Sequence, residues 1–414
     1  MSNRVMLAML GIGFSTSSFA AAVMSLAYSY LTYQLTGRAS IAVVASACLV
    51  LPLAILVKVT GAILRRRSAK TVLVWTNVAT IASYIFGTAA ITAGFISVPF
   101  LLFMALIAGI GQAFMYPAWN VLLTETAPRD SMEEVNAGMS AWWAAGALLG
   151  VLCGGLIQAN LGPAWLFVAA SVGMVPMVVV LFFVRSGQVA VEPEDLTQGQ
   201  MGRTSAPSLR QTLDYIRQSP VLWVGLLLML VNELVGYSLL SVMPALANEV
   251  DPSPITYALL MASFYLGLFF VDIWMHRIHR ERSLRTLIVI ALIVMFVLLV
   301  ISPILGQAPE GTFKLIAFMI LLSPIGLMVV VIETFYESAQ QVGGTDETKV
   351  PYVLALFSAV GAVVGTIGGF ILAAIIDLSN VFPALLLAGL LWGGSLLYLR
   401  WARHLQHVDA VSAD

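Results

Sequence analysis

Long apolar runs separated by short polar segments recur along the whole chain. Twelve of these runs reach about 20 residues or more, the length at which an α-helix crosses roughly 30 Å of hydrocarbon. Backbone amides in lipid have no water to bond, so each run is predicted to be helical. The predicted spans cover residues 6–33, 40–63, 71–93, 98–124, 135–158, 163–185, 220–248, 254–275, 283–302, 313–336, 350–376 and 381–401. The pattern thus predicts an all-α polytopic membrane protein with twelve transmembrane helices.

One long polar segment interrupts this pattern. Residues 186–219 include Glu192, Asp195, Arg203 and Arg217, and they separate six predicted spans from six others. We predict an N-terminal six-helix bundle over residues 1–185 and a cytosolic linker over residues 186–219. A C-terminal six-helix bundle with a short cytosolic tail follows over residues 220–414.

The composition supports the membrane class. Of the 414 residues, 60% are hydrophobic and 10% charged, with a mean hydropathy of +0.95, whereas an ordinary soluble domain is about 25% charged. The net charge of -1 shows no excess of basic residues of the kind that binds nucleic acid. The sequence contains no phosphate-binding loop, hydrolase elbow or catalytic triad pattern. We therefore expect no enzyme activity, no cofactor and no nucleic-acid partner.

The basic residues predict the orientation. Seventeen of the 20 Lys and Arg residues flank one face of the predicted spans, Arg38 and Lys314 flank the other, and Lys58 lies within a span. By the positive-inside rule both termini are cytoplasmic. The first apolar run is longer than a signal-peptide core, so we expect it to be retained. The predicted location is the plasma membrane, expected to be a bacterial inner membrane.

The two halves repeat one another. The fifth and eleventh spans each carry four glycines at small-residue spacing, namely Gly146, Gly150, Gly154 and Gly155, then Gly361, Gly365, Gly368 and Gly369. Gly361 follows Gly146 by 215 residues, and Glu337 follows Glu125 by 212. Such repetition favours two parallel halves with a midplane site between them. The alternative is that glycine-rich interfaces arise in any polytopic protein.

Several motifs resemble the major facilitator superfamily. The segment from Gly146 to Gly155 is similar to that family's fifth-helix antiporter motif, with Val151 in place of its proline. Residues 111–138 resemble the branch that contains the enterobactin exporter and related drug effluxers. The resemblance implies two pseudo-symmetric six-helix bundles, a small-molecule substrate and export rather than import. We expect a monomer in the lipid bilayer that exchanges its substrate for protons.

The gating residues depart from that family's pattern. Between the second and third helices Arg65 occupies the place of the usual acid, followed by Arg66. In the second half Asp272, followed by Arg277, either supplies the missing carboxylate or pairs with His276 four residues on. Glu125 and Arg129 form an i,i+4 pair that the resemblance assigns to a gate. Glu333 and Glu337, near the end of the tenth span, either gate the transporter or meet water.

Polar residues inside the spans predict a substrate cavity. The resemblance places the first, fourth, seventh and tenth helices along a central path, and aromatic and amide groups there suit an amphipathic guest. The cavity candidates are Tyr28, Tyr30, Gln112, Tyr116, Asn120, Tyr237, Ser241 and Lys58. Alternatively, such hydroxyls bond back to helix carbonyls or across helices, and Lys58 extends to the cytosolic headgroups.

Glu233 is the candidate for proton coupling, with Asn232 beside it. It lies about 20 Å along a span that must cover about 30 Å, where an ionised carboxylate costs about 2.5 to 3.5 kcal/mol or more. An acid in this position can capture a proton on one side and release it when the cavity hydrates. The alternative is a static hydrogen-bonded helix contact. The His pairs 276/279 and 404/407 lack a third ligand, so no metal site is expected.

Together these features predict a secondary active transporter that works by alternating access. We expect it to export a siderophore-like metabolite or an amphipathic drug by proton antiport. Two other classes remain open: a proton-coupled metabolite importer, and a lipid flippase or non-transporting membrane sensor.

Overall fold

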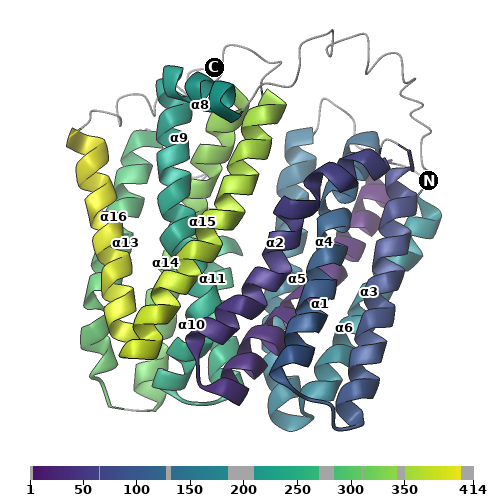
Figure 1. The fold of residues 1–414 in the computed structure, drawn as a ribbon, viewed down its shortest axis with the longest axis horizontal. Helices are drawn as coiled ribbons and strands as arrows, with labels where there is room; N and C mark the ends of the chain where they lie inside the picture. The colour runs from purple at the N-terminus through teal and green to yellow at the C-terminus, as the bar shows by residue number, and fades with distance from the viewer. Residues whose placement is uncertain are drawn as a thin grey trace.

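The computed structural model describes residues 3–64, 66–126, 132–184, 209–269, 284–309, 311–342 and 350–401 (Figure 1). The side chains of a few of these residues, Lys58 included, lie outside the description. Arg65, Arg129, Asp272 and Arg277, all predicted to gate the transporter, lie outside the described residues entirely.

Every element of the described residues is helical. The first half comprises α1 (Asn3–Thr36), α2 (Ala39–Leu64), α3 (Ala69–Thr92), α4 (Val98–Thr126), α5 (Met132–Asn160) and α6 (Pro163–Phe183). The second half comprises α8 (Leu209–Gln218), α9 (Pro220–Val231), the π-helix η2 (Asn232–Tyr237), α10 (Ser238–Val250), α11 (Pro254–Phe269), α13 (Leu284–Gly306), α14 (Thr312–Val342), α15 (Val350–Leu378) and α16 (Val381–Trp401). The predicted all-α class is confirmed.

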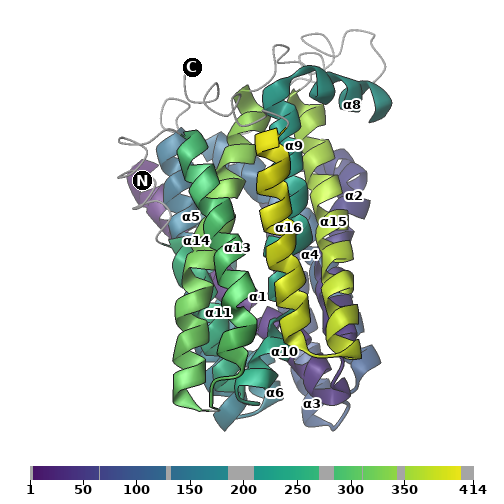
Figure 2. The same ribbon diagram turned by 90° about the vertical axis from the view of Figure 1, so that its left-hand side faces the viewer.

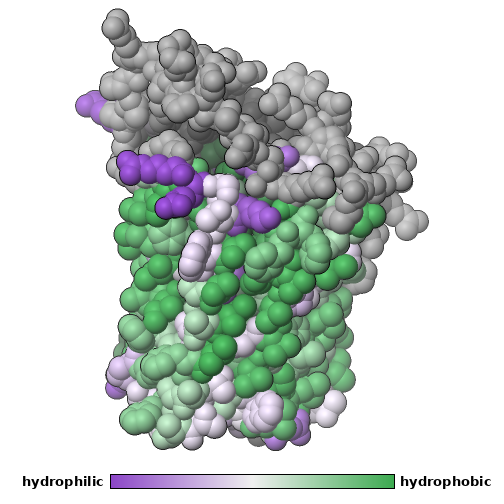
Figure 3. Space-filling model, turned by 90° about the vertical axis from the view of Figure 1, so that its right-hand side faces the viewer, coloured by the Kyte–Doolittle hydropathy of each residue, from purple (hydrophilic) through white to green (hydrophobic). Residues whose placement is uncertain are grey.

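The membrane crossings follow the predicted spans closely. Within the described residues, eleven helices are long and apolar enough to cross a membrane, with Pro220–Val250 counted as one. The shorter apolar α11 coincides with the eighth predicted span, whose last residues lie outside the description. The tenth span continues to Val342, six residues beyond its predicted end, so Glu337 lies inside a helix. Figure 3 shows the resulting apolar belt, with hydrophilic surface at its two ends.

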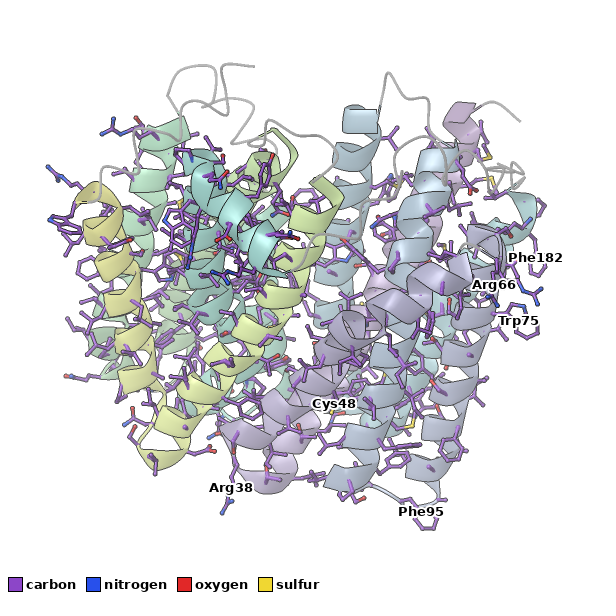
Figure 4. The ribbon with its side chains drawn as sticks, turned by 45° about the horizontal axis from the view of Figure 1, so that its top comes forward. Arg38, Cys48, Arg66, Trp75, Phe95 and Phe182 are labelled. Atoms are coloured by element: carbon purple, nitrogen blue, oxygen red, sulfur yellow. The ribbon has the colours of Figure 1, made fainter. Side chains whose placement is uncertain are left out.

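Two bundles stand side by side, α1 to α6 in one and α9 to α16 in the other (Figures 1 and 2). Between the bundles, α2 packs against α15 and α5 against α11. The side of the molecule where α1 begins and α16 ends carries Arg66, Arg67, Lys70, Arg210, Arg217, Arg285 and Arg400, and we name it the basic side. Arg38 and Lys314 lie on the opposite side, and Figure 4 labels Arg38 there.

The segment predicted as a linker ends in a helix. Residues Leu209–Gln218 form α8, which packs against α9 and α15 on the basic side (Figure 1). Its Thr212 and Ile216 are buried while Arg210 is exposed, as expected of an amphipathic helix on a surface. Ser219 then caps α9 by accepting a hydrogen bond from the Leu222 amide at 3.4 Å, with Pro220 in the first turn.

The bundles are joined at the opposite side. Asp377, near the end of α15, accepts hydrogen bonds from the backbone amides of Ala39 at 2.6 Å and Ser40 at 3.2 Å. These are free amides of the first turn of α2, where a carboxylate is also favoured by the helix dipole. The Tyr30 ring of α1 lies 5.3 Å from that of Tyr257 on α11. The two bundles are therefore in contact on the side away from the basic side.

Candidate functional site

A cavity of about 480 Å³ lies between the two bundles. From the N-terminal bundle its wall takes side chains of α1, α2 and α5, and from the C-terminal bundle side chains of η2, α10, α11, α14 and α15. The lining comprises Ser25, Ser29, Val43, Ser46, Ala47, Leu49, Val50, Trp143, Glu233, Tyr237, Ser238, Leu240, Ser241, Met261, Tyr265, Glu333, Gly361, Ala362, Gly365 and Thr366. The charged side chains in this lining are both glutamates.

Glu233 is positioned by the π-helix η2. The wider turn interrupts the seventh span at midlength, and such interruptions often mark functional sites. The neighbouring Asn232 is fully buried and donates from Nδ2 to the Val329 carbonyl of α14 at 3.2 Å. Its Oδ1 is buried without a hydrogen-bond partner. Asn232 thus anchors η2 to α14 while Glu233 lines the cavity.

Glycines of α15 make room for the Glu233 carboxyl. A Cβ added to Gly365 would lie 3.1 Å from Glu233 Oε2, and one added to Gly361 would lie 3.7 Å from Oε1. The side chain therefore rests in a groove that these two glycines form. Ser238 Oγ lies 2.8 Å from the carbonyl oxygens of both Glu233 and Gly365, and so ties η2 to the same part of α15.

Two tyrosines donate hydrogen bonds to the two cavity glutamates. Tyr336 of α14 donates to Glu233 Oε1 at 3.4 Å. Tyr237 of η2 donates to Glu333 Oε2 of α14. Each helix thus supplies one acid and the phenol that bonds to the acid of the other helix. Both carboxyls keep polar partners, as groups buried at this depth require.

The N-terminal face of the cavity has different chemistry. The hydroxyls of Ser29 and Ser46 lie 3.2 Å apart and bond to one another. Trp143 of α5 meets Tyr265 of α11 edge to face at 6.1 Å, which gives the cavity an aromatic wall. This face offers hydroxyls and rings but no carboxyl.

Four of the predicted site residues meet in this cavity, and Asn232 directly supports it. Glu233, Tyr237 and Ser241 line it. Glu333, predicted near a gate, also lines it, because its helix extends further than predicted. The sequence reading missed Trp143, Tyr265 and Tyr336. Tyr336 follows Glu333 by three residues and so shares its helix face, which is a signal that the sequence did contain.

Other candidates lie elsewhere. Tyr28 is fully buried within the N-terminal bundle, edge to face with Phe167 at 6.1 Å, rather than in the cavity. Tyr30 lines a smaller pocket of about 220 Å³ on the opposite side. Gln112 and Asn120 are not among the cavity's lining residues. Tyr116 is 58% exposed and interacts electrostatically with Glu333 and Glu337, which places it between the bundles.

The remaining gate candidates lie near the basic side. Glu337 is exposed on α14, one turn beyond Glu333. Arg66 is exposed just after α2 (Figure 4). Burial raises the pKa of Glu125, near the end of α4, and its Oε2 is buried without a hydrogen-bond partner. No cluster of metal-binding side chains occurs among the described residues, and both His pairs lie outside them.

The antiporter-like glycines pack helices together in the N-terminal bundle. A Cβ at Gly146 would collide with the Ser15 carbonyl of α1, and one at Gly150 would lie 2.5 Å from the Phe19 carbonyl. Gly155 faces the other bundle, where a Cβ would collide with Ala258 of α11. Three glycines of the motif therefore sit at close helix contacts, one of them between the bundles.

Solved transporter structures share the whole architecture. The nucleoside transporter NupG matches with a TM-score of 0.69 at 12% identity, covering 100% of both chains. A Glu-to-Gln variant of the peptide transporter POT, in complex with sulfate, matches with a TM-score of 0.70 at 13% identity, covering 97% of this chain and 95% of that one. A bacterial homologue of the human lysosomal transporter Spinster, inward-facing and unoccupied, matches with a TM-score of 0.62 at 13% identity, covering 99% of this chain and 97% of that one. At these identities the likeness shows the fold alone.

The sequence comparison identifies the family, which the structural likeness alone does not show. No curated protein sequence matches the chain. The family model of the Major Facilitator Superfamily, however, matches residues 7–343, most of the chain. With its two six-helix bundles and the cavity between them, this chain belongs to the major facilitator superfamily of membrane transporters.

Proposed function

We propose that this chain exports a small amphipathic organic molecule across the plasma membrane in exchange for protons. The observation that carries this proposal is the Glu233 carboxyl on the wall of the interbundle cavity. It touches α14 through Tyr336 and rests in the glycine groove of α15. An acid so placed can hold a proton or a substrate cation, and its surroundings change when the bundles rock.

The cavity lining favours a particular cargo. Trp143, Tyr237 and Tyr265 offer flat aromatic surface, and the serines offer hydrogen bonds. The two glutamates attract a cation and repel an anion. Of the cargo classes implied by the exporter branch, these features favour an amphipathic drug or metabolite carrying a positive charge over a carboxylate-bearing siderophore.

The orientation decides which side of the membrane the cavity would load from. We place the basic side in the cytosol, as the positive-inside rule requires. Asp377 and the Tyr30–Tyr257 contact close the other side, and Trp143 in the cavity is 38% exposed. The structure then corresponds to the state that loads cargo from the cytosol. For a neutral cargo, one proton entering across 100 mV contributes about 2.3 kcal/mol, enough for a roughly fiftyfold gradient.

Inside-out vesicles test this proposal. With an acidic lumen, vesicles holding the wild-type chain should accumulate the monocation 1-methyl-4-phenylpyridinium, and Glu233→Gln should abolish the accumulation. Glu249→Gln, a matched change in the last turn of α10 on the opposite side and outside the cavity lining, should leave it intact. Accumulation by Glu233→Gln at the wild-type level would remove this acid from coupling. Uptake driven by external acid in right-side-out vesicles would instead establish an importer.

A further inference from the structure

The two cavity acids are paired through each other's helices. Glu233 and Tyr237 lie four residues apart on η2, and Glu333 and Tyr336 lie three apart on α14. Tyr237 bonds to Glu333, and Tyr336 bonds to Glu233. Moving one acid relative to the other therefore breaks or strains both bonds at once. This crossed arrangement links the two carboxyls as one unit.

Among the side chains that the structure describes, the groups that face this pair are acidic or neutral. Glu233 is faced by Tyr336 and by Gly361 and Gly365 of α15. Glu333 is faced by Tyr237, and it interacts electrostatically with Glu233, Glu337 and Tyr336. Tyr116 of α4, in the N-terminal bundle, interacts electrostatically with Glu333 and Glu337. Phenols stabilise a carboxylate by donating a hydrogen bond, but they do not neutralise it.

Two adjacent negative charges in a partly buried cavity are costly. In the empty site the cost is relieved by protons on both carboxyls, and in the loaded site by the substrate cation. Glu337 lies outside the cavity lining, one turn further along α14 and on the exposed side of that helix, so it is not part of this pair. The unit that exchanges protons for cargo therefore contains two acids.

Resting on the proposed function, we propose that Glu233 and Glu333 together exchange two protons for each organic monocation. When the basic side is open, both carboxyls release protons and the doubly negative site binds the cation. When the opposite side is open, the cation leaves and two protons bind. Each cycle then carries two positive charges inward and one outward, a net inward movement of one charge.

This stoichiometry has a thermodynamic consequence. A one-for-one exchange of a proton for a monocation moves no net charge, so the membrane potential does no work on it. With two protons, a potential of about 100 mV drives a roughly fiftyfold gradient of the cation. Glu233 contacts both α14 and α15 and is the obligatory acid, whereas Glu333 supplies the second charge.

Proteoliposomes containing the full chain test this proposal with 1-methyl-4-phenylpyridinium. The vesicles contain buffer and no dye, and they start with the same pH and the same concentration of the cation on both sides. Valinomycin with a potassium gradient then imposes a membrane potential. Wild-type vesicles that are negative inside should lose the cation against its electrical attraction, towards a fiftyfold depletion at about 100 mV. Glu333→Gln should lose this response yet still exchange cation for protons under a pH gradient. Glu249→Gln should behave as wild type.

The outcomes separate the two proposals. Wild-type exchange that ignores the potential, or a Glu333→Gln variant that still responds to it, would overturn the two-acid unit while leaving proton antiport in place. Absence of wild-type exchange under a pH gradient would reject the proposed function itself. If Glu333→Gln is inactive in both assays, the proposal is tested on the wild-type chain in weakly buffered detergent solution. The measured quantity is the number of protons released for each cation bound. About two protons per bound cation support the unit, and one or fewer contradict it.

Discussion

The fifth and eleventh spans carry glycines at similar spacing but put them to different uses. In α5, Gly146 and Gly150 bring the backbone of α1 into direct contact at Ser15 and Phe19. In α15, Gly361 and Gly365 face the side chain of Glu233. Each helix pair also has a serine hydrogen bond: Ser18 Oγ donates to the Trp143 carbonyl at 2.8 Å in the first half, and Ser238 Oγ to the Gly365 carbonyl at 2.8 Å in the second.

This difference shows how one helix pair serves packing and its counterpart serves chemistry. The first half fills the glycine groove with backbone, so no space remains for a functional group. The second half admits a carboxyl at the level of the π-helix η2, and restores close backbone contact at Gly368, where a Cβ would collide with the Leu234 carbonyl. The comparison predicts that substitutions in the two grooves fail in different ways.

Gly146→Ala should have the largest effect, on folding. Its new methyl would collide with the backbone of Ser15, which cannot rotate away, so the cost should reach or exceed the roughly 1 to 3 kcal/mol typical of overpacking. We expect a clear loss of folded protein and a lower thermal midpoint, measured by fluorescence-detected size exclusion after heating. Gly138→Ala, which has nothing within 4 Å, is the control. An unaltered midpoint for Gly146→Ala would show that the first-half groove is looser than described.

Gly365→Ala should come next, with transport affected more than folding. Its methyl would lie 3.1 Å from Glu233 Oε2, so the carboxyl must move by a few tenths of an ångström. We expect a near-normal thermal midpoint and about a tenfold loss of pH-driven uptake, equivalent to about 1.4 kcal/mol. Loss of folding with normal transport per folded molecule would place Gly365 with the packing glycines.

The sequence predicted the helices well because the membrane imposes a simple rule on length and polarity. Spans such as 381–401 coincide with helix α16. Tyr28 shows the limit of that reasoning, since its polar character gave no sign that its ring faces Phe167 inside one bundle. Helical periodicity alone does not distinguish a helix face that meets the cavity from one that meets a neighbouring helix.

The π-helix was beyond prediction for a related reason. Its extra residue per turn changes the direction of Glu233 and Tyr237 relative to a regular helix, and nothing in the local sequence specifies it. Glu333 was predicted near the helix end because the apolar run stops at residue 336, whereas helix α14 continues on polar residues to Val342. Side chains on neighbouring helices, rather than hydropathy, support that extension.

Ser238→Ala should have a moderate effect on transport. It removes the hydroxyl that lies 2.8 Å from the carbonyls of Glu233 and Gly365, and a hydrogen bond of this kind contributes about 1 kcal/mol. We expect a threefold to tenfold lower rate of pH-driven uptake, because η2 is held less firmly against α15. Ser18→Ala, the corresponding change in the first half, should lower the thermal midpoint by a similar free energy without a specific loss of transport. Equal transport defects in both variants would argue against the division between the halves.

Gly361→Ala should have the smallest effect and gives the finest measure of the groove. Its methyl would lie 3.5 Å from Glu233 Cγ and 3.7 Å from Oε1, which are ordinary van der Waals contacts. Because alanine also favours the helix over glycine by up to about 1 kcal/mol, folding should be unchanged or slightly more stable. Uptake should remain within about twofold of wild type, measured beside Gly365→Ala in the same vesicles. A defect as large as that of Gly365→Ala would mean that the carboxyl moves along the whole groove during transport, so that the free space beside Gly361 is used in another state of the cycle.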